Sequence, residues 1–390
     1  MSRCLFGCCG ALVLTALSAA AAEREVPVSM NLAPSRIVLD SRRDQPLVNV
    51  QATYADGSTR DVTTDAKLVM TSDKIARIAE GVVTPLANGQ TELVATLDGL
   101  TARAAVEVKH VEVEPPVRFR NDVLAVLTRA GCNTGKCHGS ASGKDGFRLS
   151  LFGYDPAGDH YRLTRELPGR RINLAKPEDC LLINKALAKV PHTGGKRLEE
   201  GTAHYETVMT WLTAGAPADP TDVPVPTGIE VLPKESVFAS KGEAQRLIVM
   251  ARYSDGSDRD VTDLAVFISN NDAAATVTEE GVVTGTGPGA SFILARFDQF
   301  AQGASIVVRP GTDYTSPEFK PSNYIDELVA ARWHNMHLTP SPVCSDEVFL
   351  RRVSIDLTGL LPTPEQRETF LAEADPNKRA KLVDTLLERE

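Results

Sequence analysis

Residues 54–63 of this chain read YADGSTRDVT, and nearly the same stretch, YSDGSDRDVT, returns at residues 253–262. A second string, GVVT, occurs at residues 81–84 and again at residues 281–284. The offset between the copies changes only from 199 to 200, which indicates one domain present twice. An Asp-Gly pair between short runs of alternating polarity is typical of a β-hairpin.

Short apolar segments separated by turn residues surround each copy, for example at residues 36–39, 47–54 and 92–97. This spacing predicts a small antiparallel β-sandwich. The repeated carboxylates could be calcium ligands, but we favour a role in the hairpin turn and the sandwich edge. They are Asp56, Asp61, Asp255 and Asp260.

The paired YxDGSxRDVT and GVVT strings resemble the bacterial immunoglobulin-like domain of group 2. The resemblance covers residues 27–113 and 227–310. It implies two all-β modules that act as spacers or surface-interaction modules, with possible cell-surface or polysaccharide contact, and it assigns them no chemistry.

A second motif lies between the two copies, where residues 131–139 read GCNTGKCHG. Two cysteines followed directly by a histidine, here Cys132, Cys137 and His138, are how c-type haem is attached, with the imidazole placed to bind the iron. Four residues separate the cysteines instead of the usual two, and Gly131 and Gly135 would let the wider loop bend. A Cys132–Cys137 disulfide and an incomplete zinc site remain alternatives.

Proline-rich linkers bound the region that carries this motif, residues 115–222. Apolar spacing predicts helices over residues 119–130, 177–189 and 204–214. The order of helix, GCNTGKCHG, GFRLSLFGYDP, PEDCLLINKAL, VPHTGGKRL and VMTWLTAGAP resembles the planctomycete-type cytochrome c domain. The resemblance implies a cytochrome c-like, mainly α domain that binds one covalent haem c.

In that family a segment before the closing helix supplies the distal haem ligand, commonly from a Met-Pro sequence. The corresponding segment here, VPHTGG at residues 190–195, has no methionine, so His192 becomes the expected distal ligand. Met209 is the rival, although its helical spacing with Tyr205 and Leu212 favours core packing. Two imidazoles would leave no free site on the iron, which favours electron transfer over oxygen chemistry.

Four cations flank this region and could pair with haem propionates or lie in a solvated loop. They are Arg170, Arg171, Lys196 and Arg197.

Residues 318–390 show helical periodicity, including a capping box at Thr363 to Gln366. The strings IDELVAARW, CSDEVFLRRVSIDLTGLLPTPEQ and NKRAKLVDTLL resemble the opening of a large domain of unknown function that follows cytochrome modules in exported planctomycete proteins. We expect this chain to end inside that domain. A metal site at His334, His337 and Cys344 is not favoured, because no fourth ligand follows at a standard spacing.

Residues 1–22 carry one early arginine, an apolar run and a tail of small residues, which predicts a signal peptide and export to the periplasm, cell envelope or outside. Its removal leaves 41 Lys and Arg against 51 Asp and Glu, a net charge of −10, so nucleic acid is not an expected partner. No later stretch is apolar enough to cross a membrane.

The predicted fold class is therefore multidomain, with two Ig-like sandwiches flanking a mainly α cytochrome c-like domain and a helical C-terminal segment. The expected function is an exported c-type cytochrome that passes electrons to a redox partner protein, and whether the chain is also an enzyme stays open. One alternative is a non-haem cell-envelope interaction protein with a Cys132–Cys137 disulfide. The other is the electron relay of an enzyme whose catalytic domain lies beyond this chain.

Overall fold

The computed structural model describes residues 25–311 and 314–388. The chain forms two compact units, Met1–Asp313 and Tyr314–Glu390. The predicted signal peptide, residues 1–22, lies outside the described residues.

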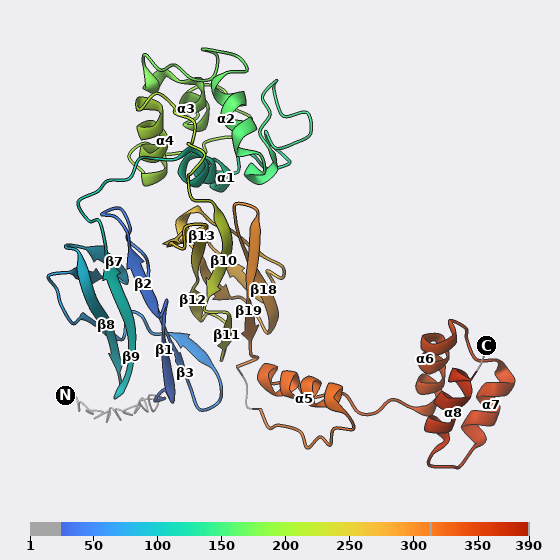
Figure 1. The fold of residues 1–390 in the computed structure, drawn as a ribbon. Helices are drawn as coiled ribbons and strands as arrows, with labels where there is room; N and C mark the ends of the chain where they lie inside the picture. Colours follow the sequence, from blue (N-terminus) through green and yellow to red (C-terminus); the bar gives the residue numbers. More distant parts are fainter. Residues whose placement is uncertain (1–24, 312–313, 389–390) are drawn as a thin grey trace, which may run out of the picture. The chain divides into compact units, whose positions relative to one another are not determined.

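The first β-sandwich pairs a three-stranded sheet with a four-stranded sheet around one core (Figure 1). The three-stranded sheet has the order β1 (Ser29–Ala33), β3 (Asn49–Thr53), β4 (Thr59–Asp61). The four-stranded sheet has the order β2 (Arg36–Leu39), β9 (Leu100–Val108), β8 (Gly89–Leu97), β5 (Lys67–Met70). A separate hairpin joins β6 (Ala76–Ala79) to β7 (Val82–Pro85). Side chains from both sheets, such as Val50 and Leu93, are fully buried between them.

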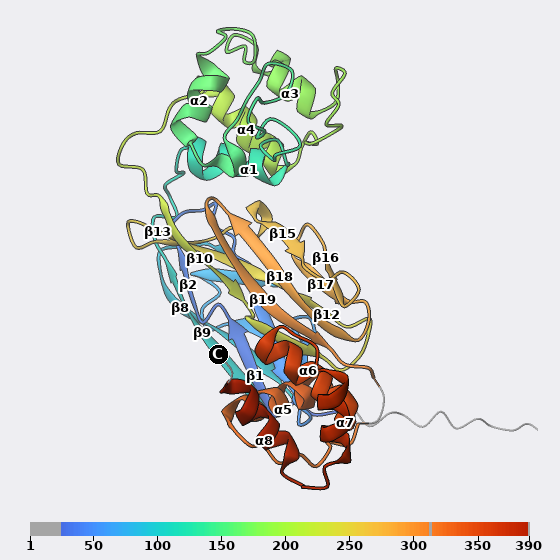
Figure 2. The same cartoon turned by 90° about the vertical axis from the view of Figure 1, so that its right-hand side faces the viewer.

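The second sandwich repeats this order of strands and has one more strand beside its short hairpin (Figure 2). Its sheets are β10 (Pro226–Leu232), β13 (Ile248–Tyr253), β14 (Asp258–Asp260); β11 (Glu235–Phe238), β19 (Phe300–Val308), β18 (Gly289–Phe297), β15 (Val266–Ser269); and β12 (Ala244–Arg246), β17 (Val282–Gly285), β16 (Ala275–Val277). Neither sandwich is wholly antiparallel as predicted, because β2 pairs with β9, and β11 with β19, in parallel. A parallel pair cannot be joined by a hairpin, and the connection spans most of each domain.

The repeated stretch forms the same hairpin in both sandwiches. The N–H of Ser58 donates to Asp56 Oδ1 at 2.9 Å, and Ser257 repeats this bond to Asp255 at 3.0 Å. Gly57 lies at φ +80°, in the left-handed region that this turn requires. The first aspartate of each copy therefore shapes the turn, as the hairpin interpretation predicts.

The second aspartate of each copy joins the hairpin to its own sandwich. Asp61 Oδ1 accepts from Thr63 N–H at 3.0 Å and from Thr63 Oγ1 at 2.6 Å. Thr63 Oγ1 in turn accepts from the N–H of Val50 in β3 at 2.9 Å. Asp260 and Thr262 form the equivalent bonds to Val249.

The other carboxylate oxygen of each aspartate reaches across to the opposite sandwich. Asp61 Oδ2 accepts from the backbone N–H of Arg246 at 3.0 Å, and Asp260 Oδ2 accepts from that of Leu47 at 2.8 Å. The repeat offset of 199 relates Leu47 to Arg246 as well as Asp61 to Asp260. The two contacts are therefore copies of each other, as in the isologous interface of a two-fold dimer.

The segment between the sandwiches, residues 115–222, contains short helices connected by long irregular loops. Its elements are η1 (Phe119–Leu124), a π-helical turn, α1 (Ala125–Arg129), η2 (Leu151–Gly153), α2 (Pro156–Thr164), η3 (Pro177–Asp179), α3 (Leu181–Ala186) and α4 (Ala203–Thr213). Its buried residues join those of the second sandwich in one hydrophobic cluster. Ion pairs fasten it there, with Arg120 to Asp298 at 2.9 Å, Arg259 to Asp122 at 2.7 Å and Arg129 to Glu279 at 3.2 Å.

The predicted mainly α cytochrome c-like domain at the centre of the fold is therefore wrong. Within residues 25–311 strands predominate over helices, and the middle segment is neither mainly helical nor built on a core of its own. The physical reason is that glycines recur through residues 131–158, where they favour turns over helix, and that the segment buries its apolar residues against the second sandwich.

The second unit is helical. It contains α5 (Tyr324–Met336), α6 (Asp346–Thr358), α7 (Pro364–Ala372) and α8 (Lys378–Leu387). The predicted capping box is present at the start of α7, where Thr363 Oγ1 accepts from Gln366 N–H and Gln366 Oε1 accepts from Thr363 N–H.

Replacing Asp61 with alanine removes acceptors for its own hairpin and for the opposite sandwich. We expect Asp61→Ala to lower the free energy of unfolding by about 2–3 kcal/mol, because several donors lose a charged partner. Urea unfolding, monitored by far-UV circular dichroism, measures the change in the free energy of unfolding. The matched control is Asp65→Ala at an exposed position close by, and equal stability of the two variants would contradict the assigned role.

Candidate functional site

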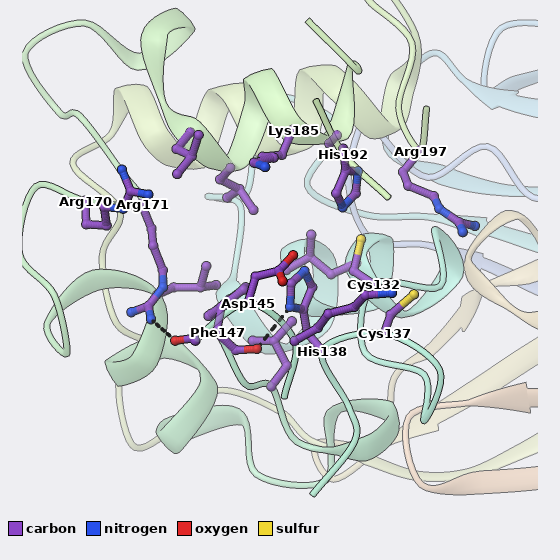
Figure 3. Close-up of a pocket in the computed structure, with 18 of the residues that line it drawn as sticks. Cys132, Cys137, His138, Asp145, Phe147, Arg170, Arg171, Lys185, His192 and Arg197 are labelled. Carbon is purple, nitrogen blue, oxygen red and sulfur yellow. Dashed lines mark hydrogen bonds between the residues drawn. The ribbon is translucent and has the colours of Figure 1, made fainter. Parts of the chain in front are cut away.

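A pocket of about 1040 Å³, including its open mouth, lies in the middle segment (Figure 3). Its walls are mainly apolar and are formed by Leu127, Leu149, Leu163, Leu167, Leu181, Leu182, Ala186 and Phe147. Cys132, Cys137, His138 and His192, the four residues predicted to hold a cofactor, all line this pocket.

The Cys-His loop leaves α1 as a compact set of turns. Cys132 N–H donates to Leu127 O at 2.9 Å and His138 N–H donates to Cys132 O at 3.0 Å. These bonds place both cysteines and His138 at one end of the helix, facing the pocket. Both cysteines are free thiols in this structure.

Two glycines determine the shape of the loop, and they are not the pair expected from the sequence. Gly131 has φ +76°, as a sharp turn after a helix requires. A Cβ on Gly139 would lie 1.9 Å from the carbonyl oxygen of Asn133, whereas a Cβ on Gly135 would meet only Leu151 at 3.9 Å. Gly139, which sequence reasoning missed, is therefore the glycine that close packing demands.

The two histidines face each other across the pocket with nearly parallel rings. Their ring centroids are 6.5 Å apart and their planes differ by 6°. Figure 3 shows His192 pointing from its loop toward His138, which lies beside the two cysteine sulfurs. The two side chains are 54 positions apart in sequence, so only the fold brings them together.

Hydrogen bonds hold both imidazoles in the same tautomer. His138 Nδ1 lies 3.0 Å from Phe147 O, and His192 Nδ1 lies 2.9 Å from Gly195 O. A carbonyl oxygen only accepts, so each Nδ1 carries a proton, and in the neutral form of each ring the lone pair is on Nε2. This is the usual arrangement of a metal-binding histidine, whose second nitrogen donates to the backbone.

The separation of the ring centroids, 6.5 Å, leaves a gap between the two imidazoles. The leucine, alanine and phenylalanine side chains of the lining make the surroundings of this gap mainly apolar.

Burial sets the protonation of the groups in the pocket. It lowers the pKa of His138, so this imidazole is neutral at neutral pH and its Nε2 stays available to a metal. Burial also raises the pKa of the Cys132 thiol to about 11, so the thiol is protonated.

Three of the four predicted cations line the pocket, namely Arg170, Arg171 and Arg197. Arg171 is buried and already pairs with Glu166 at 3.0 Å and with the carbonyls of Arg162 and Gly146, so its role is to hold the pocket wall. Lys196 does not line the pocket and pairs with Glu199.

Two further lysines that sequence reasoning missed, Lys144 and Lys185, also line the pocket. Lys185 Nζ donates to Pro191 O at 2.6 Å and so ties α3 to the loop that carries His192.

Met209, the rival distal ligand, lies on α4, packs partly against the core and is not part of the pocket lining. His160 packs edge-on against Phe119, and its Nε2–H donates to Ala216 O, 3.0 Å away. His204 lies 3.7 Å from Asp263 of the second sandwich.

A comparison with protein-family models gives a match in the C-terminal unit. Residues 324–390 match the family model PSCyt2, a protein of unknown function (DUF1549), which confirms that this part resembles a domain of unknown function. A comparison with curated proteins found no match.

Solved structures that resemble the chain do so distantly. The surface layer protein SbsC aligns over domains 5–6 with 10% identity and a TM-score of 0.27, covering 73% of this chain and 99% of that one. SbsC domains 1–6 give 11% identity and a TM-score of 0.21, covering 76% of this chain and 30% of that one. InvD of Yersinia pseudotuberculosis gives 10% identity and a TM-score of 0.16, covering 75% of this chain and 60% of that one. This chain thus spans less than a third of the longer SbsC structure.

Within residues 25–311 and 314–388, no helix is both long enough and apolar enough to cross a membrane.

A methyl group at Gly139 should disrupt the Cys-His loop. Gly139→Ala drives a Cβ into the Asn133 carbonyl, so we expect the thermal midpoint of unfolding to fall by several degrees. Gly135→Ala, whose Cβ has room, is the matched control. The two midpoints measured by calorimetry should differ clearly, and similar midpoints would show that the loop is not closely packed.

The Cys132 thiol should react slowly and in a strongly pH-dependent manner. In reduced chain made without haem-attachment machinery, we expect its alkylation by iodoacetamide to rise about tenfold per pH unit up to pH 10, because the thiolate fraction grows in that way below the pKa. Peptide mass spectrometry after timed alkylation gives the rate at Cys132. A plateau below pH 9 would contradict the raised pKa.

Proposed function

We propose that the pocket binds one haem c covalently between His138 and His192 and that the chain is an electron-transfer protein. The observation that carries this proposal is the pair of parallel imidazoles, 6.5 Å apart, with each Nδ1 tied to a backbone carbonyl. Two free thiols beside one imidazole add the means of covalent attachment. A zinc site is supported less well, because the described residues hold no group of three or more His, Cys, Asp or Glu placed for a metal ion.

The chain's own residues would do the binding and the positioning. The thiols of Cys132 and Cys137 would each add S–H across a vinyl double bond, so that no atom is lost. His138 and His192 would hold the iron, and the leucine walls would exclude water. The bound haem would supply the redox chemistry.

Electron transfer is favoured over catalysis at this site. His138 and His192 would both be used to hold the iron, so the bound group would supply electron transfer and offer no position to a substrate. Lys185 supports this arrangement, because its bond to Pro191 O holds the His192 loop over the pocket. Arg170 and Arg197 at the pocket lining fit the carboxylates of a haem.

The parts of the chain outside the pocket fit a protein that acts at the cell envelope. The repeated hairpin and its strand order support two Ig-like domains of group 2 that serve as spacers or surface-interaction modules. The predicted signal peptide supports export to the cell envelope, where c-type haem is attached in bacteria and a redox partner protein would be met.

A pyridine haemochrome spectrum of the full chain tests covalent attachment. The chain is exported from a host with haem-attachment machinery and extracted with acidified acetone, and we expect one haem per chain to remain. The double variant Cys132→Ser, Cys137→Ser should be colourless, while Cys344→Ser in the second unit should keep its haem. A folded, colourless wild-type chain would overturn the proposal.

The distal ligand is tested by removing each candidate in turn. We expect His192→Ala to open one axial position, so that ferrous protein binds carbon monoxide and added imidazole restores the six-coordinate spectrum. Met209→Leu should leave the spectrum unchanged, because Met209 lies outside the pocket lining. If Met209→Leu changed the spectrum and His192→Ala did not, Met209 would be the distal ligand.

A further inference from the structure

The pairing of the two sandwiches leaves one strand edge covered and its copy open. In the first sandwich the edge strand β2 pairs on one side only, with β9. In the second sandwich β11 pairs on one side only, with β19. In β11 the N–H and C=O groups of Glu235 and Val237 point away from β19, since Lys234 O and Phe238 O accept from the β19 side. The equivalent groups in β2 belong to Arg36 and Val38, whose neighbours Ser35 and Leu39 accept from the β9 side.

The edge of β11 is covered by the first sandwich. Gln51 Nε2 donates to Glu235 O at 3.0 Å. Val237 N–H donates to Thr59 Oγ1 at 2.9 Å. A strand edge that would otherwise attract other chains is thus satisfied inside the molecule.

The edge of β2 lacks these partners. The repeat places Met250 where the first sandwich has Gln51, and Asp258 where it has Thr59. A thioether cannot donate to a carbonyl, so the Gln51 contact has no counterpart. Within residues 25–311, no hydrogen bond reaches the N–H of Val38.

A groove runs along this open edge. It has a volume of about 1530 Å³ including its mouth and is lined by Ile37 and Val38 on one side and by Met250 and Asp258 on the other. Pro34 and Pro46 in its lining are buried, and the half-buried Leu47 and Met250 supply apolar surface. The groove therefore combines unpaired strand edge with apolar contacts, the two features that bind extended peptides.

The charges at one part of the groove indicate the partner's sign. Arg42 and Arg43 line it and are exposed. Five aspartates also line the groove, and each has a partner. Asp44 accepts from the N–H of Asp40 at 2.8 Å, Asp122 pairs with Arg259, and Asp260 accepts from the N–H of Leu47. Asp263 lies 3.7 Å from His204, and Asp258 lies 4.0 Å from Arg252. The two exposed guanidinium groups favour a carboxylate on the ligand.

We propose that this groove binds an extended peptide segment of a partner protein, which adds to β2 as a strand and places an acidic side chain against Arg42 and Arg43. Backbone bonds to Val38 and Arg36 would supply affinity, and the apolar floor around Met250 would select every second side chain. At the equivalent β11 edge, the side chains of Gln51 and Thr59 occupy the backbone groups that such a strand would use. The inference is independent of haem binding.

The test uses a phage-displayed library of random heptapeptides selected on the full chain, followed by calorimetry with the enriched peptides. We expect enriched peptides to carry an acidic residue and to bind about tenfold more weakly to Val38→Pro, which removes the free N–H without touching a bond to β9. Val38→Thr keeps the N–H and is the matched control. Arg42→Glu with Arg43→Glu should also weaken binding.

Hydrogen exchange measured by mass spectrometry keeps the test decisive if Val38→Pro does not fold. On the wild-type chain, the bound peptide should slow exchange in the segment that contains β2. Failure to enrich any peptide, protection at another surface, or equal binding to a folded Val38→Pro variant would each overturn the proposal.

Discussion

The first unit depends on one carboxylate that is used twice. Asp61 and its copy Asp260 each bind the threonine two residues on with one oxygen and the backbone of the opposite sandwich with the other. A single side chain thereby fixes the hairpin, ties it to the neighbouring strand through the threonine hydroxyl, and pairs the two domains. Burial raises the pKa of Asp260, and the three donors around it compensate the cost of placing a carboxylate there.

The sequence predicts local structure well wherever short-range chemistry decides it. The repeated Asp-Gly turn, the helix that runs into Cys132 and the capping box at Thr363 all follow from a few neighbouring residues. The parallel pairing of β2 with β9 does not, because it joins residues about 70 positions apart. The absence of a separate α domain in the middle also escaped prediction, since sharing a core with the second sandwich depends on long-range packing.

The candidate site likewise has local features that the sequence predicts and long-range features that it does not. Cys132, Cys137 and His138 are adjacent in sequence and were singled out by their spacing, while His192 was reached only through a family resemblance. The tautomers, the 6.5 Å separation of the rings and the support from Lys185 depend on residues that meet only after folding. Gly139 could have been suspected from its place directly after His138, but its need for a missing Cβ is visible only in the close approach of Asn133.

The three arginine links between the middle segment and the second sandwich have a mechanical consequence. Arg120, Arg129 and Arg259 attach at separate points, to Asp298, Glu279 and Asp122. Two attachment points would still allow rotation about the line that joins them, whereas a third removes that axis. The segment that carries His138 is therefore restrained from rotating relative to the second sandwich, so a force that turns the second sandwich also turns the pocket.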